Sequence, residues 1–263
     1  MKAGGRVVKN VAGYDLCKLF TGSYGTLGVI VELTFKLRPR PAKEVTVLAS
    51  GSMASLLEAA QSILKAPLFP VGLELISSSM AHTLNVDTHV NNPALLARFA
   101  GPEQTVIYQA DRAVFLSRSQ AGIAEAEIVP NDEMLWRGLA VAPLKFAAAV
   151  IWRAMTRPTS LCTLIEEAAK RGSDSLWQAG IAEGRLRVID VSATETGQCV
   201  AQLERLRVQS QSLAGSLVLE AAPVEIKQRF DSWDDFGAST SLMQRVKHQL
   251  DPNGILSLQR FTT

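Results

Sequence analysis

The sequence predicts an α+β fold in which helices cover a mostly antiparallel β-sheet. Two observations lead to this class. First, segments with strand character alternate with amphipathic helical segments along most of the 263 residues, and turn signals separate them. Second, 47% of the residues are hydrophobic and 20% are charged, so a chain of this length can bury a sizeable core. Together they indicate a globular protein of one large domain or two smaller ones.

The first strong pattern is a strand within "GTLGVIVELTFKLRP", residues 25–39. Apolar and mostly polar residues alternate from Val29 to Leu37, and a period of two is typical of a half-buried strand. We expect this strand to pair antiparallel with a neighbour. "RPRPA" follows, and proline lacks the amide that a strand ladder needs. The sequence therefore predicts a domain boundary near residues 38–42.

Three strand–helix–strand sets follow, with turn signals between them. The helix of the first set is expected to begin after the capping residue Ser52, and that of the third at Pro158. The turn Glu183-Gly184 predicts a hairpin in the third set. With a long helix and a last strand, the sets should form an antiparallel sheet covered by helices. The expected strands are residues 44–50, 69–77, 95–101, 126–130, 145–155, 175–182, 185–190 and 215–223, and the expected helices are 52–66, 102–118, 131–139, 158–172 and 194–213.

The C-terminal stretch "SLMQRVKHQLDPNGIL" predicts an amphipathic helix that ends at Asp251-Pro252-Asn253-Gly254. Proline stops the helix, and Asn-Gly favours a tight turn. The helix carries an apolar face that needs an apolar surface to cover it, and we expect the N-terminal segment to supply that surface. The expected domains are residues 1–41 joined by the returning segment 223–263, and residues 42–222.

Composition and charge exclude some functions. Lys and Arg number 27 against 25 Asp and Glu, and the net charge of +2 without a long basic block argues against nucleic acid as a partner. The longest apolar stretch, residues 144–152, is too short to span a bilayer, and Arg153 follows it. The N-terminus shows no secretory pattern. We therefore expect a cytoplasmic protein that does not span the membrane.

Cysteines and histidines do not predict a metal site. The cysteines, which form no C-x-x-C pair, are expected to be buried or half-buried thiols. The histidines form neither H-x-H nor H-x-x-x-H and are expected at the surface. These six residues are Cys17, Cys162, Cys199, His82, His89 and His248.

The densest glycine cluster is "GSYGTLG", residues 22–28. A nucleotide's phosphates need backbone amides that they can approach closely, and glycine offers these without a Cβ in the way. The residues that fit this use are Gly22, Ser23, Gly25, Thr26 and Gly28. The alternative is a glycine-rich turn that binds no ligand.

The whole segment "GGRVVKNVAGYDLCKLFTGSYGTLGVIVELTFKLRP", residues 4–39, resembles the second half of the FAD-binding (PCMH-type) domain of the FAD-linked oxidases of the vanillyl-alcohol oxidase type. That family usually reads K-N-x-x-G-Y-D-L-x-x-L-x-x-G-S-x-G-T-L-G-V-I. "APVEIKQRFDSW" and "SLMQRVKHQLDPNGIL" resemble, in particular, the E subunits of bacterial glycolate oxidases. The resemblance spans most of the chain and is weak over residues 85–140.

The resemblance implies a FAD-binding oxidoreductase subunit in a complex that oxidises glycolate or a related 2-hydroxy acid to the 2-oxo acid. It implies a catalytic flavoprotein subunit and an iron–sulfur subunit as partners, and a location in the cytoplasm or at the inner membrane through those partners. It also implies that residues 42–222 are a cap domain. Asp15 is expected to cap the helical turn after it. The expected FAD-binding residues are Asn10, Tyr14, Gly22, Ser23, Gly25, Thr26, Leu27, Gly28 and Ile30.

The chain departs from the family pattern at its N-terminal side and in its histidines. In the family the FAD domain begins far upstream, with another glycine-rich loop, so we expect a truncated FAD site that binds FAD weakly in this chain alone. The alternative function is a non-catalytic remnant that serves as a subunit-interaction module. The catalytic subunits of the family carry a metal-and-substrate motif with two histidines seven residues apart. His82 and His89 have that spacing in a different context, so no catalytic or metal-binding residue is predicted.

Overall fold

The computed structural model divides the chain into two compact units. The terminal unit joins Met1–Pro39 to Asp235–Thr263, and the sheet unit is Arg40–Asp234. The assignment of these units to an FAD-binding domain and a cap domain stays a prediction. The residues that the structure describes are 4–5, 14–88, 92–130, 132–146, 149–169, 175–191, 195–235 and 237–257.

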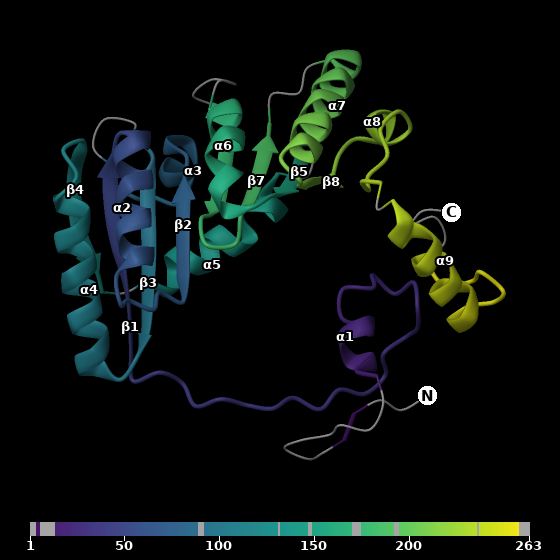
Figure 1. The fold of residues 1–263 in the computed structure, drawn as a ribbon, viewed down its shortest axis with the longest axis horizontal. Coiled ribbons are helices and arrows are strands. Elements are labelled where there is room, and N and C mark those ends of the chain that lie inside the picture. Colours follow the sequence, from purple (N-terminus) through teal and green to yellow (C-terminus); the bar gives the residue numbers. More distant parts are fainter. Residues whose placement is uncertain are drawn as a thin grey trace. The chain divides into compact units, whose positions relative to one another are not determined.

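The sheet unit contains an eight-stranded sheet in which every neighbouring pair is antiparallel (Figure 1). The strand order is β4-β1-β3-β2-β6-β7-β5-β8. The predicted α+β class with an antiparallel sheet is therefore confirmed. The strands are β1 (Lys43–Gly51), β2 (Gly72–Ile76), β3 (Ala94–Gly101), β4 (Ile123–Val129), β5 (Val150–Met155), β6 (Leu176–Gly180), β7 (Arg185–Asp190) and β8 (Ser216–Ala221).

The strands form two sets of four, whereas the sequence suggested three strand–helix–strand sets. In the first set β3 lies between β1 and β2 and pairs with both of them. In the second set β6 and β5 both pair with β7 in the same way. Each set has the split β-α-β-β-α-β arrangement. The two sets join edge to edge through β2 and β6, where Leu75 lies opposite Ala179.

Four helices, α2, α4, α6 and α7, cover one face of the sheet (Figure 1). In α2, apolar residues recur at the helical spacing over Leu56, Ala59, Ala60 and Ile63, and all four are fully buried. Ser52 begins this helix as predicted, because its hydroxyl accepts a hydrogen bond from the Ser55 amide. The helices of the unit are α2 (Met53–Lys65), α3 (Ser78–Thr83), α4 (Glu103–Arg118), α5 (Glu133–Val141), α6 (Leu161–Ala169), α7 (Thr196–Ser212) and α8 (Val224–Lys227), with 3₁₀ turns η1 (Ala142–Lys145) and η2 (Pro158–Ser160).

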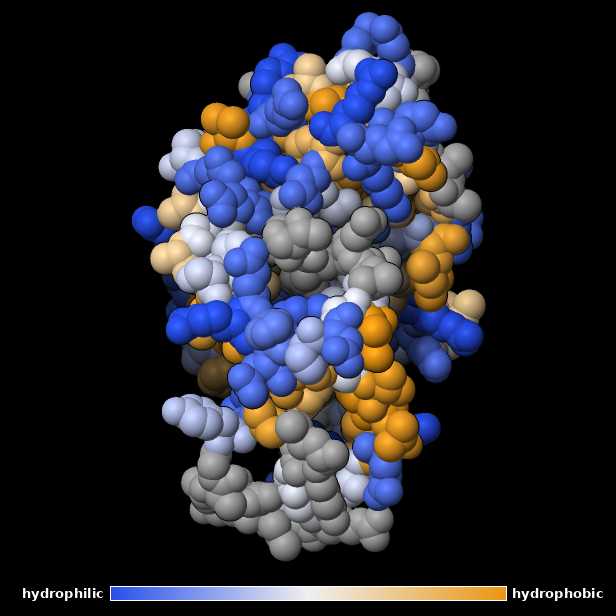
Figure 2. Space-filling model, turned by 90° about the vertical axis from the view of Figure 1, so that its right-hand side faces the viewer, coloured by the Kyte–Doolittle hydropathy of each residue, from blue (hydrophilic) through white to orange (hydrophobic). Residues whose placement is uncertain are grey.

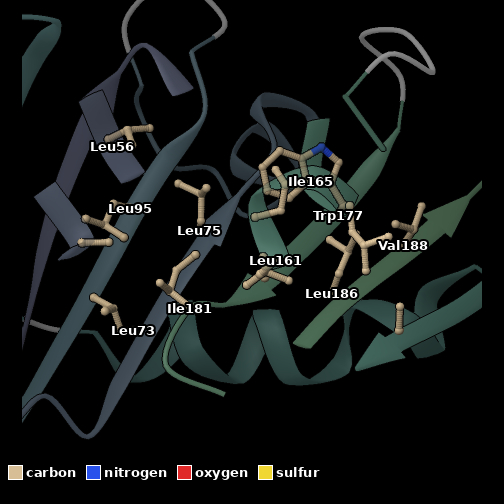
Figure 3. Packing of buried hydrophobic residues seen from close by; sticks show 14 of the residues in the cluster. Leu56, Leu73, Leu75, Leu95, Leu161, Ile165, Trp177, Ile181, Leu186 and Val188 are labelled. Atoms are coloured by element: carbon tan, nitrogen blue, oxygen red, sulfur yellow. The ribbon is translucent and has the colours of Figure 1, made fainter. Parts of the chain in front are cut away.

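The main core lies between this face and the four helices. Figure 3 shows Leu75 of the first set of strands between Leu95 on one side and Leu161 and Ile165 of α6 on the other, with Trp177 beyond them. The core therefore runs without interruption across the junction of the two sets. A smaller core lies on the opposite face, where α3, α5 and η1 cover part of the sheet.

The rest of that opposite face carries charged side chains. Glu220 of β8 accepts hydrogen bonds from Arg153 and Arg187, with Nε–O distances of 2.7 and 2.8 Å. A register shift in the pairing of β5 with β8 falls beside Glu220. Glu74 of β2 is buried and pairs with Arg185 of β7. Burial raises the pKa of Glu74 above its ordinary value, and the nearby Arg185 charge opposes that shift.

Replacing Arg185 by methionine should destabilise the sheet unit by about 3 kcal/mol at neutral pH, since it leaves Glu74 buried without its counter-charge. A carboxyl group whose pKa is raised by folding contributes stability below its unfolded pKa and loses it as the pH rises through the folded pKa. The loss in Arg185→Met should therefore be smaller near pH 4 than near pH 8. Urea unfolding at both pH values tests this. An equal loss of stability at both pH values would contradict the prediction. When Glu74→Gln is also present, the loss caused by Arg185→Met should no longer depend on pH.

The predicted strand within residues 25–39 is wrong. Residues 28–41, all of them described, contain neither helix nor strand. Val29, Val31, Leu33, Phe35 and Leu37 are between 62% and 92% exposed. A strand needs a neighbour for its backbone amides and carbonyls, and the described part of the terminal unit contains only two helices, α1 (Leu16–Phe20) and α9 (Ala238–Leu250), and no strand. The apolar alternation is real, but nothing described in this unit covers it.

Figure 2 shows hydrophobic residues standing among polar ones on one face of the molecule. Within the described ranges, every helix is too short or too polar to cross a membrane.

Candidate functional site

The candidate site begins with the short helix α1 and the glycine loop that follows it. Asp15 caps α1 as expected, because its carboxylate accepts a hydrogen bond from the Lys18 amide. The bond from Lys18 lowers the pKa of Asp15. At the other end the Thr21 hydroxyl donates to the Cys17 carbonyl at 2.7 Å. The helix is therefore fixed at both ends, and the chain turns directly into residues 22–28.

The glycine loop is a closed turn. Gly22 and Gly25 have φ values of +79° and +73°, which glycine adopts without strain, and Tyr24 between them has φ +52°. The Ser23 carbonyl accepts two hydrogen bonds from Thr26, one from its amide at 3.0 Å and one from its hydroxyl at 2.7 Å. The Ser23 amide donates to the Phe20 carbonyl at 3.2 Å. The Ser23 and Thr26 amides thus stabilise the loop itself, so they are poor candidates for ligand contacts.

The glycines differ in the space around them. A Cβ added to Gly22 would meet nothing within 4 Å, so a ligand could approach this backbone closely. A Cβ on Gly25 would lie 3.1 Å from the Ser257 hydroxyl, and one on Gly28 would lie 3.0 Å from the Phe20 ring. Gly22 therefore fits a ligand-binding role, whereas Gly25 and Gly28 are needed for packing within the unit as well.

The C-terminal segment of the terminal unit approaches this loop. Helix α9 ends at Leu250, and a turn follows in which the Gly254 amide donates to the Asp251 carbonyl at 3.1 Å. The buried Asp251 carboxylate accepts hydrogen bonds from the amides of Ile255 and Leu256 at 3.1 and 2.9 Å. Its hydrogen bond with Lys247 is the main reason that the pKa of Asp251 falls to about 2. The carboxylate is therefore charged at any pH near neutral.

A half-open cavity of about 600 Å³ lies between the glycine loop and α9, entirely within the terminal unit. This volume is in the range of small-molecule sites. Its wall is mostly apolar, and its polar lining residues include Ser23, Thr26 and Lys247. The apolar lining residues are Leu19, Leu27, Leu242, Met243, Val246 and Leu256.

The structure brings some of the predicted site residues together. Gly22, Ser23, Thr26 and Leu27 line the cavity, and Gly25 lies in the same loop. Tyr14 is 96% exposed, and Ile30 is 53% exposed on the segment after the loop. Asn10 lies outside the described residues. The assignment of these residues to FAD binding stays a prediction.

Sequence reasoning missed Lys247 and Asp251 as parts of this site. The signal was present as K-x-x-x-D-P-x-G in the C-terminal stretch, but only a helix end and a family resemblance were inferred from it, and no contact with the glycine loop. The two side chains are one turn apart and bond to each other. Nothing local in the sequence shows that Lys247 also reaches the Thr26 carbonyl, 221 positions away.

The cysteine prediction was wrong for one residue. Cys17 is exposed on the five-residue helix α1, which has no buried residue and so no face that packs on a core. Cys162 is half-buried and Cys199 is buried, as expected. Among the histidines, His82 and His248 are exposed, while His89 lies outside the described residues. In the part of the chain that the structure describes, His, Cys, Asp and Glu side chains form no group that could hold a metal ion.

No model of a known protein family matches this chain. In sequence the chain is 33% identical over 112 residues to the glycolate oxidase subunit GlcD of Bacillus subtilis, a match that covers 40% of this chain and 24% of that protein. It is 51% identical over 47 residues to the glycolate oxidase subunit GlcE of Escherichia coli, or 18% of this chain and 13% of that protein. A FAD-linked oxidoreductase of Mycobacterium tuberculosis is 26% identical over 280 residues, or 98% of this chain and 60% of that protein.

The resemblance to the FAD-linked oxidases is confirmed. In structure the chain is similar to an alkyldihydroxyacetonephosphate synthase, with a TM-score of 0.57 and 14% identity over 95% of this chain and 50% of the other. That likeness shows the fold. In each of these matches the chain covers less than two thirds of the other protein's length.

Proposed function

We propose that the chain is a FAD-binding subunit of a glycolate oxidase type complex, which oxidises glycolate or a related 2-hydroxy acid to the 2-oxo acid. The glycine loop carries the proposal, because its backbone at Gly22 is open to a phosphate-bearing ligand and an apolar cavity adjoins it. FAD combines phosphates with two flat ring systems and suits such a site. The names of the relatives support the proposal, since two are glycolate oxidase subunits and one is a FAD-linked oxidoreductase.

Specific residues would hold the cofactor. The open backbone at Gly22 would contact the phosphates, and Leu27 with the apolar cavity wall would contact a ring. We retain Asn10 and Tyr14 as further contacts predicted from the family pattern. When bound, FAD would supply the redox chemistry. The role of the chain's own residues in this proposal is to bind and orient it.

We further propose that the chain works beside a catalytic flavoprotein subunit and an iron–sulfur subunit that passes electrons onward. The word "subunit" in the names of two relatives supports an assembly. The proposed location is the cytoplasm, or the inner membrane surface through these partners.

The alternative function is a subunit-interaction module without its own flavin. One observation favours it. The apolar side chains from Val29 to Leu37 are exposed along an extended segment, and a surface of this kind is typical of contact with another polypeptide.

Reconstitution with the two partner subunits separates these functions. The parent chain should support glycolate-dependent reduction of an electron-acceptor dye, and omitting it should abolish the activity. Gly25→Val should abolish activity while assembly persists, because valine at φ +73° is strained and would crowd Ser257. Gly197→Val, at a helix position with open space, is the control. Full activity in an assembled Gly25→Val complex would favour the interaction module.

A further inference from the structure

Lys247 joins three separate stretches of the terminal unit. Its ammonium donates to the Thr26 carbonyl at 2.8 Å, to the Leu256 carbonyl at 2.9 Å and to the Asp251 carboxylate. An ammonium group has three hydrogens and no acceptor, so these bonds use its whole capacity. One side chain therefore links the glycine loop, the end of α9 and the turn after it.

Lys247 contacts the loop at Thr26, the residue that also makes two of the loop's internal hydrogen bonds. Thr26 is buried, and its amide and hydroxyl are both turned inward to the Ser23 carbonyl. The Thr26 carbonyl accepts the hydrogen bond from the Lys247 ammonium. A second link lies nearby, since the Ser257 hydroxyl donates to the Tyr24 carbonyl at 3.2 Å. Both links come from the C-terminal segment.

Asp251 fixes the position of Lys247. Its carboxylate is buried and bonds to the amides of Ile255 and Leu256, so it cannot move without breaking the turn. The Lys247 side chain, which is one third exposed, is thereby held at its charged end. An ordinary cation near a helix C-terminus would only interact with the helix dipole and would not need this arrangement.

We propose that Lys247 is a positioning residue for the glycine loop, which holds the backbone of residues 22–28 in the conformation that binds ligand. Pre-organising a binding loop raises affinity because less ordering is required on binding. The ligand is FAD in so far as the proposed function holds, but the positioning of the loop can be measured without FAD.

Hydrogen exchange of the full chain without FAD tests the positioning directly. In Lys247→Met, the amides of Ser23 and Thr26 should exchange roughly tenfold faster or more than in the parent. Arg245→Met is the matched control, because Arg245 is an exposed cation two residues away on the same helix. It should leave the exchange unchanged. Unchanged exchange of the loop in Lys247→Met would overturn the proposal.

Lys247→Arg separates positioning from charge. A planar guanidinium keeps the charge near the helix end but cannot place three donors as an ammonium does. The loop amides should therefore exchange faster in Lys247→Arg, while the amides of Ile255 and Leu256 change less. Parent-like exchange of the loop in this variant would show that charge alone suffices and would overturn the proposal.

A FAD titration adds the functional readout. Lys247→Met should weaken FAD binding by about tenfold relative to the parent and to Arg245→Met. Equal affinity in Lys247→Met and the parent would contradict the proposal. If the parent chain binds FAD too weakly to titrate, the exchange data alone decide the role of Lys247, and reconstitution with the partner subunits tests the proposed function. Tryptophan fluorescence of Trp152 and Trp177 reports whether the sheet unit of each variant is folded.

Discussion

Gly184→Ala is expected to destabilise the sheet unit by about 3 to 5 kcal/mol, a large part of the stability of an ordinary domain. Gly184 ends the loop between β6 and β7 and has φ +72°, where alanine is strained. A Cβ there would lie 1.9 Å from the Thr156 carbonyl oxygen and 3.1 Å from the Pro158 nitrogen. These are backbone atoms and cannot rotate away.

The surrounding hydrogen bonds make the effect larger. The Thr156 amide donates to the Gly184 carbonyl at 2.8 Å, and the Gly184 amide donates to the Gly180 carbonyl at 3.0 Å. Relieving the clash would pull β5 away from the β6–β7 hairpin and break the first of these bonds. All three strands carry core residues, so the damage would spread into the core.

Urea unfolding followed by tryptophan fluorescence measures this effect, because Trp152 and Trp177 are buried in the same core. Gly197→Ala is the control. A Cβ at Gly197 would meet nothing within 4 Å, and alanine suits a helix better than glycine, so this variant should be unchanged or slightly more stable. A Gly184→Ala protein within about 0.5 kcal/mol of the parent would show that the loop adapts easily.

Local signals in the sequence predicted much of the sheet unit. The Ser52 cap needs only a hydroxyl and the next three residues, and a turn at Glu183-Gly184 needs only a residue that tolerates positive φ. The helix over residues 102–118 has a regular period and was placed within a residue of α4. Each of these features depends on neighbours in the sequence.

Features that depend on distant partners were predicted less well. The alternation from Val29 to Leu37 was assigned to a strand, but alternation does not supply the neighbouring strand that pairing requires. The grouping of the strands was also wrong, because the order in the sheet is set by pairing between segments and not by their succession. The bond from Lys247 to Thr26 spans almost the whole chain and has no local signal.

In the candidate site, too, the local turn was predicted and the contacts within it were not. The glycine cluster predicted a turn without Cβ atoms in the way, and Gly22 and Gly25 lie in such a turn, both with positive φ. It did not predict that the Ser23 and Thr26 amides would be used inside the turn, since glycine spacing does not show which groups bond to one another.

The purified 263-residue chain is expected to bind FAD only weakly and to lose its yellow colour on desalting. A dinucleotide is normally buried over most of its surface, whereas the cavity beside the glycine loop is half-open. The exposed apolar side chains from Val29 to Leu37 lie on the segment that follows the loop. We expect a polypeptide carrying the first half of an FAD-linked oxidase FAD domain to cover this segment and to raise FAD affinity by at least about a hundredfold, because the ligand would then be enclosed.

A pair of variants tests the apolar face of this segment. Leu33→Glu places a charge on the face that carries Val29, Phe35 and Leu37, and should abolish the gain in affinity because the charge would be buried on contact. Thr34→Glu places the same charge on the other face and should leave the gain nearly intact. Absorbance of the flavin band after desalting measures both. Tight, stoichiometric FAD in the isolated parent chain would contradict the need for a second polypeptide, and an equal response of the two variants would contradict the role of the apolar face.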